Sequence, residues 1–252
     1  MFEKSNALTR IRDAQSVTPR VVDHAHYLLD IHENNAIVLF SDVLSKQIPK
    51  SFAANAFNSF REAMHQIEIV RLCALWDAAN LDRESIPTII ELIDNDDVNA
   101  ALAEEERSRH EVPAAPLDDN QFENAETKNL VAKAIEKQQQ EFGEKRAKQA
   151  MNELKATIKQ ARALRTSDRL NSLRNLRDKH LAHYLVDCRA EKAGVPIEPA
   201  KYGDERQVLE ESLAIIQTLY CWVNGIGISF EQSRTFDRQC AEALWSACKF
   251  SI

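Results

Sequence analysis

Apolar residues recur three to four positions apart along most of this sequence, a spacing typical of amphipathic α-helices. The first such stretch begins at Pro19 and ends at Pro49, with its apolar positions mostly on one stripe. The second covers residues 52–80 and has Ser51 at the position of an N-cap. Because its second half is apolar nearly all round, we expect this helix to lie in the centre of a bundle.

Proline, glycine and short polar turns divide the rest of the chain. A short helix is expected with Pro87 in its first turn. Further helices are expected at residues 98–109, 122–164, 168–188 and 204–223. A last helix is expected to end near residue 248. Loops are expected at residues 113–119 and 194–203, and residues 224–227 break the chain before the last helix. Asp204 and Gln207 have the spacing of a capping box.

Glycine is scarce, because the 252 residues contain 5 glycines and 7 prolines, whereas average usage would give roughly 18 glycines. Glycine supplies the turns of β-sandwiches and barrels and the phosphate-binding loops of nucleotide folds, so these classes are disfavoured. The sequence therefore predicts an all-α, up-and-down helical bundle. We expect a single domain over residues 1–252, with a long charged helical arm or insertion at about residues 120–166.

Charge is unevenly distributed along the chain, whose formal net charge is −7. Residues 82–126 contain 14 acidic and 3 basic side chains, whereas residues 133–183 contain 13 basic and 6 acidic ones. The overall acidity argues against a protein that coats nucleic acid in general. The basic region is nevertheless compatible with one local nucleic-acid site.

Other classes of site are disfavoured by short patterns. Apolar runs are interrupted by charges, so we expect a cytoplasmic protein with neither a signal-peptide core nor a membrane span. Five cysteines without a C-x-x-C pair indicate free thiols rather than disulfides or a zinc site. His24 and His26 lack the i, i+4 spacing of helical metal ligands, and no metal site is predicted.

Residues 173–184, which read L-R-N-L-R-D-K-H-L-A-H-Y, contain the one motif that indicates chemistry. An arginine followed by Asn or Asp, and then by a histidine after four to six further residues, resembles the signature of the HEPN superfamily. The stretch R-D-K-x-x-A-H is similar to the AbiU-like abortive-infection branch of that superfamily. Residues 71–77 (R-L-C-A-L-W-D) and 85–90 (S-I-P-T-I-I) also resemble that branch, and the likeness extends loosely over residues 20–225.

This resemblance implies a HEPN-type bundle that acts as a metal-independent endoribonuclease without a cofactor. It also implies a homodimer in which arginine and histidine side chains of both subunits line one cleft. The implied partners are RNA and an antitoxin or another defence protein, in phage defence or a toxin–antitoxin system. The residues that it implies are Arg177, His183 and Asp178 for catalysis, and Arg174, Lys179, His180 and Tyr184 for substrate binding.

These residue types suit RNA cleavage. A histidine can take a proton from a ribose 2′-hydroxyl or give one to the leaving 5′-oxygen. An arginine can hold the scissile phosphate and stabilise the charge that develops on it. Because no glycine lies near the motif, a phosphate there would be held by side chains rather than by backbone amides.

The register of the motif stays open, because Arg174 and His180 repeat the spacing of Arg177 and His183. We prefer the second pair for its sequence context. On an ideal α-helix its members lie about 240° apart, so a helix irregularity or a partner subunit would have to bring them together. Tyr184 directly follows His183, whereas a nucleotidyl-modified variant of the family has one residue between them, which makes that regulation doubtful.

Two alternatives to catalysis are open. The first is a non-catalytic helical module that binds RNA, a nucleotide or a partner protein, and the second is a structural dimer built on the charged arm. Arg71 and Asp77 are interpreted as a structural ion pair within the second helix. Three tryptophans at helical spacing are interpreted as core residues: Trp76, Trp222 and Trp245.

Overall fold

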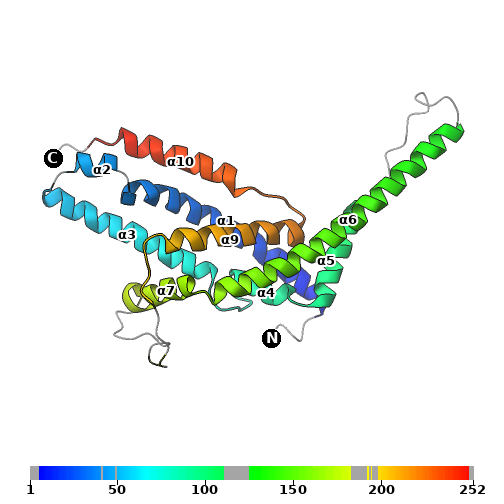
Figure 1. Ribbon diagram of the computed structural model, residues 1–252, viewed down its shortest axis with the longest axis horizontal. Helices are drawn as coiled ribbons and strands as arrows, with labels where there is room; N and C mark the ends of the chain where they lie inside the picture. Colours follow the sequence, from blue (N-terminus) through cyan, green and yellow to red (C-terminus); the bar gives the residue numbers. More distant parts are fainter. Residues whose placement is uncertain are drawn as a thin grey trace.

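The computed structural model describes residues 6–40, 42–48, 50–110, 125–182, 192, 194 and 198–249. This part of the chain contains helices and no β-strand, which confirms the predicted all-α bundle. The long helices are α1 (Ala7–Phe40), α3 (Phe52–Leu75), α6 (Ala125–Arg165), α9 (Asp204–Asn224) and α10 (Phe230–Ala247). Figure 1 shows α1, α3, α9 and α10 alongside one another, while α6 crosses one end of this group and extends away from it.

α1 lies at the centre of the bundle, in contact with α3, α9, α10 and the short α4 (Ile86–Ile93). Its buried apolar residues follow the spacing of a helical stripe: Ile11, Ala14, Val21, Val22, Ala25, Leu28, Leu29, Ile31 and Val38. Burying one leucine or isoleucine stabilises a fold by about 1.5–3 kcal/mol. This stripe therefore explains why α1 continues through a proline.

Pro19 lies inside α1 and does not begin it, so the predicted helix start is wrong. Proline has no N–H, and the carbonyl of Gln15 four residues earlier loses its usual donor. The side-chain amide of Asn224, at the end of α9, donates to that carbonyl at 2.9 Å. Gln15 Nε2 in turn donates to the carbonyl of Val223 at 3.1 Å. The interruption in α1 is thus satisfied by the facing helix.

The starts of α3 and α4 agree with the sequence. Ser51 accepts a hydrogen bond from the Ala54 N–H at 3.3 Å, as an N-cap does. Ser85 does the same for Thr88, also at 3.3 Å, and Pro87 lies in the first turn of α4. Both starts are local features, which is why the sequence predicts them.

The course of α3 differs from the prediction. The helix ends at Leu75 instead of residue 80, and Ile67 and Val70 are 44% and 39% exposed. α3 therefore buries one face, and α1 occupies the central place expected for it. The short α2 (Asp42–Gln47) lies between them, and the helix end predicted at Pro49 falls outside the described residues.

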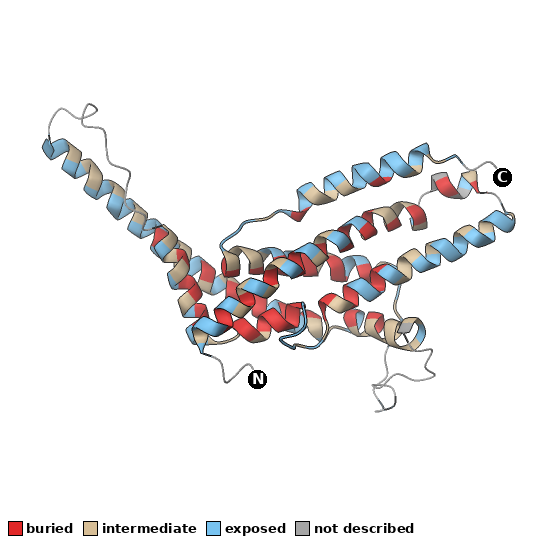
Figure 2. Ribbon diagram, turned by 180° about the vertical axis from the view of Figure 1, so that it is seen from behind, coloured by how far each residue is buried: buried red, intermediate tan, exposed pale blue. Residues whose placement is uncertain are grey.

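The predicted charged arm is α6, which consists of two parts. Its residues 125–142 include none that is buried, and this part projects from the body (Figure 2). From Gly143 onward it packs on α9 and on α5 (Asp96–Arg109). A Cβ at Gly143 would lie 3.1 Å from the carbonyl oxygen of Arg107, so the missing side chain permits the close approach of α5. The loop predicted at residues 113–119 lies outside the described residues.

The prediction that the three tryptophans are core residues is confirmed for two of them. Trp76 and Trp222 are buried, whereas Trp245 is half-buried. The ring of Trp222 lies under the guanidinium of Arg146 at 4.4 Å from its centroid, and its Nε1 donates to Glu153 Oε2 at 2.7 Å. This residue of α9 therefore fixes the inner part of α6.

The predicted capping box at the start of α9 is wrong. The N-cap position is Gly203, whose φ of 95° suits a residue without a Cβ. Asp204 already belongs to the helix, and its Oδ2 accepts from the Lys201 N–H at 2.8 Å. The carboxylate of Glu205 accepts from the Gly203 N–H at 3.0 Å. The acidic side chains of this first turn therefore bind backbone N–H groups in front of the helix.

Candidate functional site

The arginine–histidine motif lies on α7 (Asp168–Leu176) and on the π-helical turn η3 (Arg177–Ala182) that follows it directly. Ser167 caps α7 by accepting from the Leu170 N–H at 3.3 Å. Leu170 is buried in the core that α7 shares with α9. The sequence predicted one helix over residues 168–188, but the described part of it changes its winding at Arg177.

Arg177 is held by two carboxylates. Its Nε donates to Asp178 Oδ1 at 2.8 Å, and its Nη1 donates to Asp77 Oδ1 at 3.1 Å. Within the described residues, no acceptor lies within hydrogen-bond distance of Nη2. Burial lowers the pKa of this guanidinium, but the interactions with Asp178, with the nearby Cys73 and with Asp77 outweigh burial and leave it raised. The group is therefore a fixed cation with a donor to spare.

Asp77 joins the two segments that carry the resemblance. It lies just beyond the end of α3, a hundred positions before Arg177. Its Oδ2 is also 3.9 Å from Nη1 of Arg83. The expected ion pair between Arg71 and Asp77 is wrong, because Arg71 is exposed and lies over the ring of Tyr27 at 5.5 Å. The Asp77 carboxylate therefore binds Arg177 of η3 and not Arg71 of α3.

Arg174 has a different set of partners. Its Nη1 donates to the carbonyl of Arg165 at 3.1 Å, and its Nη2 donates to the carbonyl of Trp76. These carbonyls are at the ends of α6 and α3, where helices have unpaired acceptors. Burial lowers the pKa of the guanidinium, and neighbouring Arg177 adds to that effect. The structure thus brings Arg177 and Asp178 together and directs Arg174 toward the backbone.

The winding of η3 changes the geometry of the motif. In a π-helix each N–H bonds to the carbonyl five residues earlier, so a turn contains about one residue more than in an α-helix. The separation of about 240° between Arg177 and His183 applies to an ideal α-helix and not to this segment. The described chain is thus irregularly wound up to Ala182, while His183 and Tyr184 lie outside the described residues.

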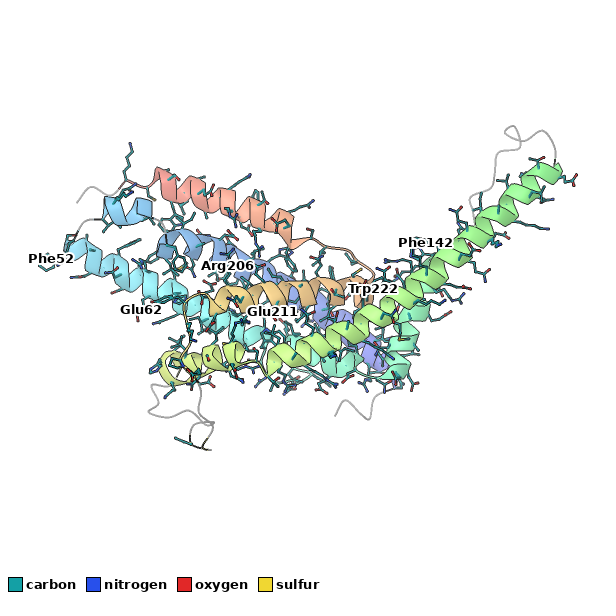
Figure 3. The ribbon with its side chains drawn as sticks, viewed as in Figure 1. Phe52, Glu62, Phe142, Arg206, Glu211 and Trp222 are labelled. Atoms are coloured by element: carbon teal, nitrogen blue, oxygen red, sulfur yellow. The ribbon has the colours of Figure 1, made fainter. Side chains whose placement is uncertain are left out.

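A cavity of about 790 Å³ lies beside η3. Its walls come from α3, from α7 with η3, and from the segment that leads into α9. Glu62, labelled in Figure 3, is one of the α3 residues in this wall. His180 is exposed and lines this cavity, whereas Arg177 is not part of its lining. Across it, His65 Nε2 is 3.7 Å from Glu205 Oε1. The interaction with Glu205 raises the pKa of His65 more than burial lowers it.

Comparison with known proteins decides the relationship of the chain. The family model HEPN_AbiU2, described as AbiU2, matches residues 15–244. The chain belongs to the AbiU2 family. Neither the curated proteins nor the solved structures contain a significant match.

Membership of the AbiU2 family confirms the resemblance that the motif indicated, and with it the HEPN, abortive-infection character of the chain. The matched region includes α7, η3 and the end of α3, which are the three elements around Arg177. None of the described helices is long and apolar enough to cross a membrane.

Sequence reasoning missed the pair formed by His65 and Glu205, since these residues are distant in the chain and each fits an ordinary helix. A partial signal exists on α3, where polar residues recur at helical spacing on the side that lines the cavity. They are Asn58, Arg61, Glu62, His65 and Gln66. The Asp204–Gln207 pattern predicts only a helix cap at this turn, so it does not indicate a partner for Glu205.

Proposed function

We propose that this AbiU2-family chain is a metal-independent endoribonuclease that acts as a homodimer in phage defence or in a toxin–antitoxin pair. In this proposal Arg177 binds the scissile phosphate and His183 transfers the proton. Asp178 is a positioning residue, because it acts through Arg177. An antitoxin or another defence protein is the proposed regulatory partner.

One observation carries the proposal: Arg177 is fixed by Asp77 and Asp178 at the first residue of a π-helical turn, with Nη2 left for another acceptor. A guanidinium whose orientation is set in advance loses little entropy when it binds a phosphate. It can also stabilise the extra negative charge of the transition state without reorganising. π-Helical turns occur frequently at functional sites.

The proposed reaction is an attack within the RNA chain. The 2′-hydroxyl gives its proton to a base, and its oxygen bonds to the adjacent phosphorus while the bond from phosphorus to the 5′-oxygen breaks. The leaving 5′-oxygen takes up a proton, so the products end in a 2′,3′-cyclic phosphate and a 5′-hydroxyl. A histidine near neutral pKa can carry out either proton transfer.

The other residues of the motif have supporting roles in this proposal. Lys179, His180 and Tyr184 bind the RNA backbone or bases beside the scissile phosphate. Arg174 keeps the ends of α3 and α6 next to α7 through its hydrogen bonds to Trp76 and Arg165. We therefore favour the register of Arg177 with His183 over that of Arg174 with His180.

The test is cleavage of total RNA in the presence of EDTA. We expect wild type to release fragments with 2′,3′-cyclic ends, and His183→Ala and Arg177→Ala to release none. Arg169→Ala is the matched control, because Arg169 is an exposed arginine on α7 whose interactions are with Asp204 and Glu211. It should cleave as wild type does.

Absence of cleavage by a folded, dimeric wild type would contradict the proposal. If such a protein still bound RNA in a salt-dependent manner, and His183→Ala bound it equally well, the non-catalytic binding module would be the better description. Cleavage that persists in Arg177→Ala would show that the carboxylate-held guanidinium is not the phosphate-binding group.

A further inference from the structure

The cavity beside η3 has the size of a ligand site, and Arg177 is not among the described residues that line it. Its volume of about 790 Å³ falls within the roughly 300–1,000 Å³ of small-molecule sites. Leu176 and Leu181 line it, and these residues stand on either side of Arg177 in the sequence. A ligand in the cavity would therefore contact the same turn that presents Arg177.

Two polar atoms in the cavity wall make no hydrogen bond within the described residues, although one of them, His65 Nε2, has a carboxylate nearby. Arg61 Nε and His65 Nε2 are buried, and neither has a hydrogen-bond partner within the described residues. Glu205 is 3.7 Å from His65 Nε2, which is an ion-pair distance and not a hydrogen bond. Leaving a buried donor unpaired costs about 1–3 kcal/mol. Arg61 therefore has hydrogen-bonding capacity that no described residue uses, in a side chain that lines the cavity.

An aromatic platform borders the same space. The ring of Tyr202 stacks on that of His65, with centroids 5.8 Å apart and planes 14° from parallel. Tyr202 is 82% exposed, so the face turned away from His65 is open. Bases stack on exposed aromatic rings irrespective of sequence. The ion pair with Glu205 holds the histidine that supports the platform.

The rest of the lining includes a non-polar surface and a second cation. Ile69, Leu173 and Leu176 give the non-polar surface, and Lys201 is the second basic side chain besides Arg61. Of the acidic side chains, Glu205 is balanced by His65, and Glu62 is exposed and accepts a hydrogen bond from Gln66 at 3.2 Å. The cavity thus combines a stacking surface, a non-polar wall and cationic donors.

We propose that this cavity binds one nucleotide, with the base on Tyr202 and the non-polar wall and the phosphate on Arg61 and Lys201. As a subsite for the RNA chain that reaches Arg177, this inference rests on the proposed function. A free mononucleotide has the same chemistry, and the two sources are separated by the probes below.

The test measures binding without cleavage. One probe is a fluorescently labelled 2′-O-methyl oligonucleotide, which lacks the nucleophilic hydroxyl, and the other is a nucleoside 5′-monophosphate. Tyr202→Ala should weaken binding about tenfold, within the range for loss of one stacking partner, whereas Tyr202→Phe should bind as wild type does. Arg61→Ala should weaken binding about tenfold through loss of a charge-assisted contact.

Two matched controls keep the result specific. Phe236→Ala removes a 65% exposed aromatic side chain from α10, and Arg71→Ala removes an exposed arginine of α3 that lies over Tyr27. Both should bind the probes as wild type does. Each variant is first checked for an unchanged Tm, which is expected because Tyr202 is exposed and Arg61 Nε makes no hydrogen bond to any described residue.

The outcomes separate this inference from the proposed function. Equal binding of both probes by wild type, Tyr202→Ala and Arg61→Ala would overturn the nucleotide site, even if RNA were cleaved. Weaker binding of the oligonucleotide alone would assign the cavity to the RNA chain, and weaker binding of the monophosphate as well would show that a free nucleotide suffices. Either binding result would support the site even if wild type cleaved no RNA.

Discussion

Two helices of this chain depart from regular hydrogen bonding, and the protein treats the two places differently. In α1, Pro19 removes a donor where α1 packs half-buried against α9, and Asn224 of α9 supplies a replacement to the Gln15 carbonyl at 2.9 Å. After α7, the chain winds as a π-helix, and its first residue, Arg177, binds two carboxylates. The interruption in α1 is repaired by a neutral amide, whereas the one after α7 presents a charge.

The energetics of the two places explain this difference. A carbonyl without a partner in the core costs about 1–3 kcal/mol, so the repair at Gln15 contributes to stability. Partly exposed ion pairs contribute about 0–1 kcal/mol, and the side chains of Asp77 and Asp178 are 38% and 45% exposed. The two ion pairs of Arg177 therefore add little to the free energy of unfolding. We infer that Asp77 and Asp178 instead hold the guanidinium in one orientation.

Removing Asp77 should give the largest effect and should act on activity. In Asp77→Ala the guanidinium loses one of its two anchors, and a displacement near 1 Å at a catalytic group can cost about 10²-fold in rate. We expect RNA cleavage to fall by about that factor while the free energy of unfolding changes by less than about 1 kcal/mol. Arg83→Ala is the control, since it removes the more distant neighbour of Asp77 and should leave cleavage nearly unchanged. A loss of folding in proportion to the loss of cleavage would argue against an orienting role.

Replacing Arg174 should act on stability instead. In Arg174→Gln the carbonyls of Trp76 and Arg165 lose their charged donor, which is worth about 1.5–3 kcal/mol per hydrogen bond to a charged group. We expect the free energy of unfolding to fall by about 2–3 kcal/mol, measured by urea denaturation, and cleavage by the folded fraction to be kept. Arg169→Gln, on the same helix, should change neither quantity. Loss of cleavage in folded Arg174→Gln, with cleavage kept in Arg177→Ala, would restore the alternative register with His180.

The repair in α1 can be tested with a double-mutant cycle. Asn224→Leu leaves the Gln15 carbonyl without a donor and should reduce the free energy of unfolding by about 1–3 kcal/mol. In the Pro19→Ala background the new backbone N–H can donate to that carbonyl, so the same substitution should cost clearly less. An equal cost in both backgrounds would show that Asn224 stabilises the protein elsewhere.

The sequence predicts the local parts of this structure and not the long-range ones. The caps at Ser51 and Ser85 and the start of α7 after Thr166 and Ser167 follow from residues a few positions apart. Pro19 was misread, because the donor that compensates for it comes from a residue more than two hundred positions away. No periodicity indicates such a pairing.

The candidate site shows the same division. The motif around Arg177 is contiguous, and the sequence predicts it. Its partner Asp77 is predicted to pair with Arg71, at the other end of the segment 71–77, whereas it binds Arg177. The cavity was missed, because His65 and Glu205 meet only when α3 packs near the start of α9. The spacing of Arg177 and His183 calls for a helix irregularity or a partner subunit, but no local pattern predicts the π-helical winding itself.

The smallest effect is expected at a third pair, His65 with Glu205, whose side chains are 18% and 6% exposed. The pKa of His65 is raised above 6.5 by Glu205, so its contribution to stability is complete below that pH and is lost as the pH rises through the raised pKa. Burial raises the pKa of Glu205, but His65 and backbone N–H groups outweigh burial and bring it below 4.5, so its contribution is present above that pH. The pair is therefore most stabilising between these limits.

Glu205→Gln should accordingly lower the Tm by about 2–4 °C, the shift that about 1 kcal/mol produces in a chain of this size, when measured near pH 5.5. As the pH rises through the raised pKa of His65, the difference should shrink toward the part that comes from the hydrogen bond between Glu205 and the Gly203 N–H. His65→Gln should show the same dependence on pH, and the double variant should lose it. A Tm difference that is constant across this range would mean that the pair acts by packing, and that its charge contributes only to the cavity it borders.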